Sequence, residues 1–325
     1  MLSFLRLIRF PNLVMVALTM YAMLYGIAHP VLEYYGGEIV TSPLQFIFLV
    51  LSFVFLAAAG YVINDYFDRK ADLVNRPDTI VVGIHIKRRW AMVFHTVFNI
   101  IGVILGFAVA FSIGKWWFGF LFIAFSLILW WYSSNLKKLP VAGNLTVAIL
   151  GAVVPLTIAG FQYYGTIRVL GILPVNISIA MKEIFDISVG FAVFAFMFNF
   201  IRELVKDMED IEGDKAMYCK TIPIVLGIRL TKYLASLLCF AGVFLVLLSY
   251  VAYIRNLSYM TNDFISIWYV PVLVALPLFY CGIRLIFSEK KSDYKMISNI
   301  LKLNMLTGIL YTLVMFLIII SNTVK

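Results

Sequence analysis

The sequence predicts an all-α polytopic membrane protein with nine transmembrane helices. Three observations support this fold class. The 325 residues are 63% hydrophobic and only 13% charged, whereas soluble domains carry about 25% charged residues. The mean hydropathy is +0.97, and apolar runs long enough to cross a bilayer recur from end to end. The acidic residues are concentrated, because 10 of the 17 lie in segments 65–78 and 203–214.

The expected spans are joined by short connections on one side and longer ones on the other. Arg6 and Arg9 precede the first run without a small-residue cleavage site after it, so we expect a retained first helix and not a signal peptide. Pro174 and Asp186 leave the sixth span the shortest apolar core, and we expect residues 178–185 (SIAMKEIF) to form a separate short surface helix. The predicted spans cover residues 11–28, 44–63, 91–113, 116–134, 143–162, 186–202, 232–254, 266–287 and 300–321.

The basic residues predict the orientation of these spans. With the N-terminus inside, 21 of the 26 Lys and Arg residues fall in the inner loops, as the positive-inside rule requires. We therefore expect an integral protein of the cell (inner) membrane with both acidic segments on the cytoplasmic side and the C-terminus outside. No basic patch interleaved with aromatic residues occurs outside these loops, so the charge gives no indication of nucleic-acid binding. No obligate protein partner is predicted.

One spacing of aspartates occurs twice. Asp65, Asp68 and Asp72 lie in NDYFDRKAD, and the pattern D-x-x-D-x-x-x-D returns in KDMEDIEGD. On a helix, positions i, i+3 and i+7 share one face. Each of these octads follows an apolar run directly, so we expect each to extend the cytoplasmic end of a transmembrane helix. Pro77 should end the first extension and Gly213 should weaken the second.

The octads predict bound Mg²⁺ and, through it, a polyphosphate. Carboxylates at a helix C-terminus are unfavourable by a few tenths to about 1 kcal/mol each, which calls for a compensating cation. Mg²⁺ takes carboxylate oxygens and bridges them to substrate phosphates, and Asn64 adds a neutral oxygen. The alternative is a solvated acidic helix end, in which Lys206 and Lys215 neutralise the second octad. The repeated spacing favours the ion site, formed by Asp65, Asp68, Asp72, Asp207, Asp210 and Asp214.

Basic residues share the cytoplasmic side with the octads. Each one individually is explained by topology, because inner loops are rich in Lys and Arg. Lys137 is the strongest candidate for a phosphate ligand, because its short loop WYSSNLKKLPVAGN has few places to lie except beside the octads.

These motifs resemble the UbiA superfamily of intramembrane prenyltransferases. The pattern N-D-x-x-D-x-x-x-D is met from Asn64 to Asp72, and RELVKDMEDIEGD matches the second motif of the superfamily. Further similarity lies in IRFPN, which contains Arg9 and Asn12; in YSSNLKKLPVAGN, which contains Tyr132, Lys137 and Asn144; and in TIPIVLG at residues 221–227. The resemblance covers the chain from end to end.

The resemblance implies one UbiA-like domain, residues 1–325, with its nine helices around a central cavity. Such a domain transfers a prenyl group from an allylic diphosphate to a lipophilic acceptor. By analogy, Asp65 and Asp68 hold one Mg²⁺ and Asp207 and Asp210 hold another, and Asp214 is a further catalytic carboxylate. The substrate-binding set implied is Asn12, Asn64, Asp72, Arg76, Tyr132, Lys137, Asn144 and Lys206.

The chain departs from the family after the first octad. Where the family continues N-R-P-x-R-P, this sequence has Thr79 and Ile80 in place of the second Arg-Pro. One basic phosphate contact is therefore missing, and Lys87, Arg88 and Arg89 are the candidates to replace it.

The second motif most resembles the branch that geranylgeranylates geranylgeranylglyceryl phosphate, so this lipid is the expected acceptor. Prenylation of an aromatic quinone precursor is the alternative within the superfamily. A divalent-cation transporter is the alternative from another class, but transporters place ionisable residues near the bilayer midplane. Here the acidic residues gather at the ends of the spans, which favours the enzyme.

Overall fold

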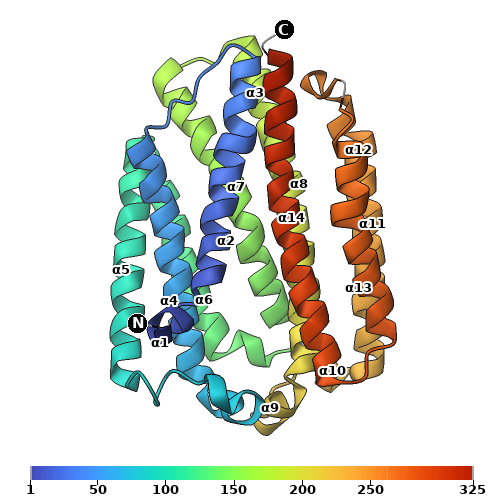
Figure 1. The fold of residues 1–325 in the computed structure, drawn as a ribbon. Coiled ribbons are helices and arrows are strands. Elements are labelled where there is room, and N and C mark those ends of the chain that lie inside the picture. The colour runs from blue at the N-terminus through green and yellow to red at the C-terminus, as the bar shows by residue number, and fades with distance from the viewer. Residues whose placement is uncertain (1, 262, 324–325) are drawn as a thin grey trace. The chain divides into compact units, whose positions relative to one another are not determined.

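The computed structural model describes residues 2–261 and 263–323. Within these ranges, nine helical segments are long and apolar enough to cross a membrane, which confirms the predicted fold class (Figure 1). Many large apolar side chains are exposed, including Ile104, Leu127, Leu237 and Leu317. Such a surface is stable in lipid, where backbone polar groups must bond within each helix. The chain is an integral membrane protein.

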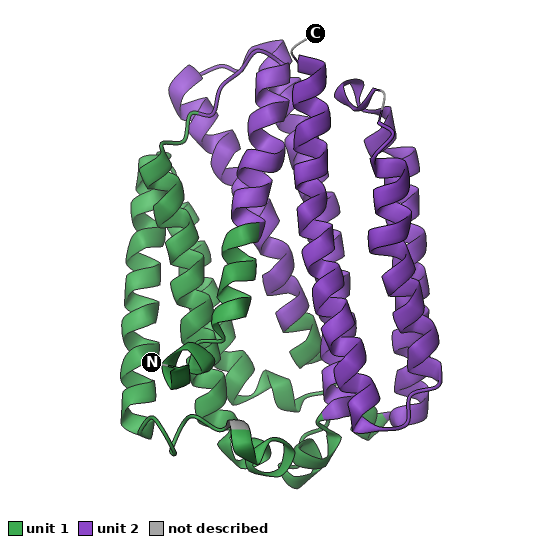
Figure 2. Cartoon of the chain, viewed as in Figure 1, with its two compact units in different colours: residues 1–18, 40–146, 210–225 green, residues 19–39, 147–209, 226–325 purple. Residues whose placement is uncertain are grey.

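Contacts divide the chain into two compact units, each built from segments that are discontinuous in the sequence (Figure 2). Unit 1 comprises residues 1–18, 40–146 and 210–225, and unit 2 comprises residues 19–39, 147–209 and 226–325. The single UbiA-like domain stays a prediction.

Unit 1 contains the first octad and the last two aspartates of the second. Its elements are α1 (Leu2–Leu7), the start of α2 (Phe10–Tyr21), α4 (Pro43–Asn75), η2 (Pro77–Thr79), α5 (Arg88–Ser112), η3 (Trp116–Gly119), α6 (Phe120–Ser134), η4 (Leu136–Lys138), the start of α7 (Ala142–Leu170), α9 (Ile211–Ala216) and α10 (Ile222–Val225).

The long helix α4 is the centre of unit 1. It begins at a capping box, in which Ser42 Oγ accepts from Gln45 N at 3.3 Å and Gln45 Oε1 accepts from Ser42 N at 2.9 Å, and these bonds satisfy N–H groups that the helix cannot. Phe53 packs edge-on against Phe122 of α6, with ring centroids 5.6 Å apart. Ser52 Oγ donates to the Gly102 carbonyl of α5 at 2.7 Å. Small residues and interhelical bonds of this kind hold membrane helices together.

Unit 2 contains the C-terminal half of the spans. Its elements are the end of α2, the π-helix η1 (Ala22–Ala28), α3 (His29–Tyr34), most of α7, α8 (Val175–Glu209), α11 (Ile228–Ala252), η5 (Ile254–Asn256), η6 (Ser258–Met260), α12 (Ser266–Tyr269), the π-helix η7 (Val270–Ala275), α13 (Leu276–Ile286) and α14 (Lys291–Thr323).

Two α14 side chains bond to the backbone of η7, where the helix leaves α geometry. Asn304 Nδ2 donates to the Val274 carbonyl at 3.0 Å, and Thr307 Oγ1 donates to the Leu273 carbonyl at 3.0 Å. Carbonyls freed by a π segment need such partners in a membrane, so these two bonds make the irregular segment possible.

The structure corrects the prediction for the sixth span. Residues 178–185 do not form a separate surface helix, because they belong to α8, which runs unbroken for 35 residues. Two partners cover Asp186 within this helix: Lys182 Nζ lies 3.1 Å from its carboxylate and Tyr253 OH donates to it at 3.2 Å. With its charge paired, Asp186 does not interrupt the span.

Candidate active site

The first octad lies at the end of α4, as predicted. Asp65, Asp68 and Asp72 occupy one face of the helix, and α4 ends at Asn75. Arg76 follows with φ −152° and ψ 60°, because the residue before a proline is sterically excluded from the helical region. The chain therefore turns away directly after the octad, and the three carboxylates lie close to the end of an apolar helix.

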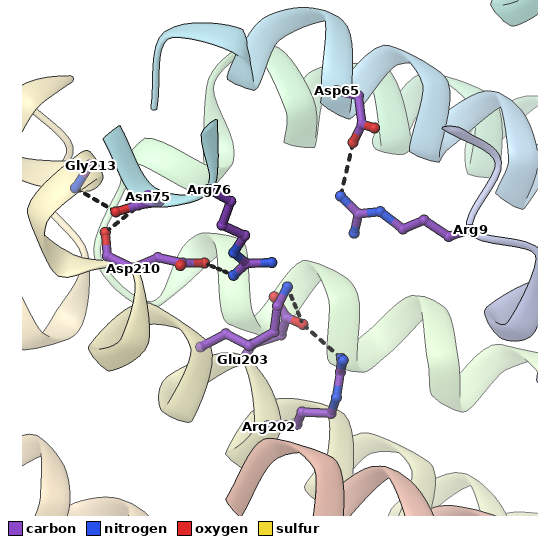
Figure 3. Close-up of polar contacts among 9 residues, drawn as sticks. Arg9, Asp65, Asn75, Arg76, Arg202, Glu203, Asp210 and Gly213 are labelled. Atoms are coloured by element: carbon purple, nitrogen blue, oxygen red, sulfur yellow. Dashed lines mark hydrogen bonds and ion pairs between the residues drawn. The ribbon is translucent and has the colours of Figure 1, made fainter. Parts of the chain in front are cut away.

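Three basic side chains from separate segments of unit 1 pair with octad carboxylates. Arg9 Nη2 lies 3.0 Å from Asp65 Oδ1, as Figure 3 shows. Lys137 in η4 forms an ion pair with Asp68, and its side chain is only 15% exposed. Arg76 forms the third pair, with Asp210 of the second octad (Figure 3). Both octads thus contribute carboxylates to one charged cluster within unit 1.

The backbone at Arg9 is unusual. Its φ of 48° places a non-glycine residue in the left-handed region, which costs free energy and is common at functional sites. The guanidinium also lies 5.1 Å from the centre of the Tyr61 ring, within the range of a cation–π contact. Ion pair and ring contact together hold Arg9 beside Asp65, and they offset the strain between α1 and α2.

The second octad does not form one helical face, contrary to the prediction. Helix α8 ends at Glu209 and α9 begins at Ile211, so Asp210 lies in the break between them. Asp207 remains on α8 in unit 2, whereas Asp210 and Asp214 belong to unit 1. The break comes before Gly213, which lies inside α9 and does not end a helix.

The Asn75 amide joins the end of α4 to α9. Its Nδ2 donates to the Asp210 carbonyl at 3.1 Å, and its Oδ1 accepts from Gly213 N at 2.9 Å (Figure 3). A Cβ added at Gly213 would lie 2.2 Å from Asn75 Nδ2 and 2.8 Å from the Ala71 carbonyl. Glycine is therefore required here for close approach of the two helices, and this approach brings Asp210 to Arg76.

Asp214 lies on α9, partly buried within unit 1. Burial and the negative charges of Asp210 and Asp68 raise the pKa of this carboxyl to about 6, because each of these effects disfavours the ionised form. A carboxylate with such a pKa accepts a proton near neutral pH, which suits a base.

The cluster fits a Mg²⁺ ion. Asp210 Oδ1 is buried, and no described residue gives it a hydrogen bond, so this oxygen is available to a cation. Within residues 2–261 and 263–323, no group of three His, Cys, Asp or Glu side chains is placed to hold a metal ion. Mg²⁺ requires only one or two protein carboxylates when water and substrate phosphates complete its shell, so the arrangement suits an ion that arrives with a phosphorylated ligand.

The other predicted substrate-binding residues lie on five different helices. Asn64 precedes Asp65 on α4, Asn12 lies near the start of α2, Tyr132 lies near the end of α6, and Asn144 is buried in the first turn of α7. Their substrate contacts stay predictions. Lys206 lies on α8 in unit 2, beside Glu203.

Two residues enter the site that the sequence analysis did not assign to it, namely Arg9 and Asn75. Arg9 lies in the IRFPN segment, from which only Asn12 was predicted to bind substrate. Asn75 begins the N-R-P segment after the first octad, but no local pattern predicts its two partners, which lie 135 and 138 residues away.

One of the three basic residues that are candidates to replace the missing second Arg-Pro contacts α4. Of the three candidates, Arg88 has its guanidinium 4.4 Å from the centre of the Tyr66 ring. Tyr66 follows Asp65 directly on α4. Arg88, Lys87 and Arg89 are all exposed. Arg88 is thus the one held against the first octad's helix.

Fold and site together define an all-helical integral membrane protein with a charged cluster at the end of an apolar helix. Residues 34–306 match the UbiA prenyltransferase family, and the chain belongs to this family. It is a prenyltransferase, which confirms the resemblance seen in the motifs and disfavours a transporter.

Relatives and solved structures agree with this assignment. The digeranylgeranylglyceryl phosphate synthase of Methanobrevibacter smithii is 30% identical over 260 residues, which cover 80% of this chain and 83% of the relative. A solved structure concerning digeranylgeranylglyceryl phosphate synthase in membranes is 23% identical, with a TM-score of 0.55 over 95% of this chain and 97% of that one. A UbiA homologue from Archaeoglobus fulgidus, bound to GPP and Mg²⁺, is 17% identical, with a TM-score of 0.51 over 94% and 98%. At these identities the structures show a shared fold.

Proposed function

We propose that this prenyltransferase transfers a prenyl group from an allylic prenyl diphosphate to a lipid acceptor, with geranylgeranylglyceryl phosphate as the favoured acceptor. The observation that carries the proposal is the convergence of Arg9, Lys137 and Arg76 on octad carboxylates within unit 1. The name of the Methanobrevibacter smithii relative supports this acceptor. The count of basic residues in the inner loops supports a site on the cytoplasmic side.

The ion pairs suggest how the site accommodates its substrate. Asp65, Asp68 and Asp210 are the proposed ligands of Mg²⁺ within unit 1, and the ion would neutralise the diphosphate as a Lewis acid when bound. Asp207, on α8 in unit 2, stays a predicted ligand. Carboxylates that bind an ion release the basic side chains that pair with them here. Arg9, Lys137 and Arg76 are then positioned to donate to phosphate oxygens, so the site keeps its charge balance as the ligand enters.

The reaction exchanges one C–O bond for another. The bond between C1 of the prenyl group and the diphosphate oxygen breaks, and its electron pair leaves with the diphosphate. Lys137 and the two arginines stabilise the negative charge that develops on this leaving group. The acceptor hydroxyl oxygen bonds to C1 and loses its proton, for which Asp214 is the proposed base. The apolar spans keep water from the allylic cation.

The test is an assay of the purified protein with a panel of labelled prenyl diphosphates and Mg²⁺. Geranylgeranylglyceryl phosphate and an aromatic quinone precursor are offered as acceptors, and products are identified by mass spectrometry. We expect an ether-linked lipid product. A prenylated aromatic ring as the only product would overturn the proposed acceptor.

A matched pair of lysine variants tests the site itself. Lys137→Ala should lower the rate about 10²- to 10³-fold, the usual effect of removing one preorganised electrostatic group. Lys138→Ala should retain the wild-type rate, because this neighbouring side chain is exposed. Equal rates in the two variants would contradict the role of Lys137.

A further inference from the structure

A second charged cluster lies on α8, within unit 2. Glu203 is buried, with 9% of its surface exposed. Its Oε1 lies 3.5 Å from Arg202 Nη1 and 3.6 Å from Lys206 Nζ, and Figure 3 shows the contact with Arg202. Arg202 and Lys206 are separated by one helical turn, so Glu203 holds both basic groups on one side of α8.

This cluster has an excess of positive charge. Two basic side chains share one carboxylate, and the side chains of Arg202 and Lys206 are only 22% and 23% exposed. Arg202 Nε is buried and finds no acceptor in the part of the chain that the structure describes. A partly buried cation with an unmade hydrogen bond is costly, so the cluster is suited to a further anion.

The cluster lies in the last two turns of α8, at the end of the predicted span 186–202. Asn199 precedes Glu203 by one turn on the same face, and its amide fits against Gly151 of α7, where an added Cβ would lie 2.4 Å from Nδ2. Asn199 Nδ2 donates to the Ala195 carbonyl at 2.7 Å. Partly buried charges at the end of a span are stable only with polar partners, so this polar face of α8 is suited to a ligand.

We propose that Arg202 and Lys206, held by Glu203, bind the phosphate monoester of the acceptor lipid. This inference rests on the proposed function and deepens it. In unit 1, each of three cations pairs with a carboxylate of an octad, whereas here the counter-ion is Glu203, which belongs to neither octad. The α8 cluster thus has a counter-ion of its own outside the octads, which suits a monophosphate that binds without a metal ion.

The geometry selects a class of acceptor. A guanidinium donates two parallel hydrogen bonds to phosphate, and a nearby ammonium adds a third contact. A neutral aromatic acceptor offers no such anion. The same groups could instead serve the diphosphate of the donor, so the experiment measures the two substrates separately.

The test uses the full-length purified protein with the variants Arg202→Gln and Lys206→Gln. We expect the KM for geranylgeranylglyceryl phosphate to rise about 10- to 100-fold, as loss of a hydrogen bond to a charged group implies. The KM for the prenyl diphosphate should stay unchanged. With geranylgeranylglycerol, which lacks the phosphate, variants and wild type should have equal kcat/KM. Lys182→Gln is the control, because this exposed lysine of the same helix pairs with Asp186.

Other outcomes overturn the inference. A rise in the donor KM alone would assign the cluster to the diphosphate, and equal losses with both acceptors would assign it a structural role. Binding is measured independently of turnover: in EDTA, the phosphorylated lipid should raise the melting temperature of the wild type and not of Arg202→Gln. Absence of this difference refutes the inference whatever the turnover, whereas absence of transfer by the wild type to every acceptor refutes the proposed function.

Discussion

The Asn75 amide provides the sharpest test of how the site is assembled. Asn75→Ala removes one hydrogen bond to the Asp210 carbonyl and one from Gly213 N, which are 3.1 and 2.9 Å long. No charge and no octad carboxylate changes. If this amide positions α9 against α4, the variant should lose activity although every proposed metal ligand remains.

The expected magnitude follows from the two bonds. Each contributes about 0.5–1.5 kcal/mol net, so their loss costs about 1–3 kcal/mol. Since 1.4 kcal/mol is a factor of ten, the ratio of docked to undocked α9 should fall about 5- to 150-fold. The transfer rate should fall by up to this factor, because Asp210 and Asp214 move with α9.

The assay is the initial rate of prenyl transfer at a series of Mg²⁺ and donor concentrations. A higher Mg²⁺ requirement is expected, since Asp210 is one of its proposed ligands. The matched control is Asn256→Ala in unit 2, which removes two hydrogen bonds that the side-chain amide donates to the carbonyls of Val251 and Ala252. This variant should keep the wild-type Mg²⁺ dependence. A wild-type rate and Mg²⁺ dependence in Asn75→Ala would refute the reasoning.

Three further changes probe the same unit. Gly213→Ala should lower both the rate and the melting temperature, because overpacking against Asn75 costs about 1–3 kcal/mol; Gly190→Ala, where a Cβ meets nothing within 4 Å, should do neither. Burial and the charge of Asp210 raise the pKa of Asp214 to about 6, above the value of about 3.9 in an unfolded chain. The stability that Asp214 contributes is therefore full below pH 4 and is lost as the pH rises through 6. In metal-free thermal unfolding, the stability of Asp214→Asn relative to wild type should therefore be higher at pH 7 than at pH 4. An equal stability difference at the two pH values would show that Asp214 does not titrate in this range. Removal of Mg²⁺ with EDTA should abolish transfer and its return should restore it, and undiminished turnover in EDTA would argue against the metal.

The two octads show where local sequence pattern succeeds and where it fails. For the first, the apolar run, the aspartate spacing and Pro77 are all local signals, and α4 follows them to its last residue, Asn75. For the second, the same spacing predicts one face, yet the helix breaks at Asp210. The bonds to this break come from Asn75 and Arg76, which lie 135 and 134 residues earlier in the chain, so the local pattern contains no trace of them.

The sequence by itself determined the nine spans, the family and the carboxylates of the first octad, because hydropathy and helical spacing act over a few turns of one helix. The tertiary structure decided that Arg9 and Lys137 pair with these carboxylates, that Arg76 pairs with Asp210, and that Asp210 leaves α8. It also decided that Glu203 pairs with two cations near the end of α8. These outcomes depend on which distant side chains meet, and in a membrane interior a charge must find such a partner to be stable.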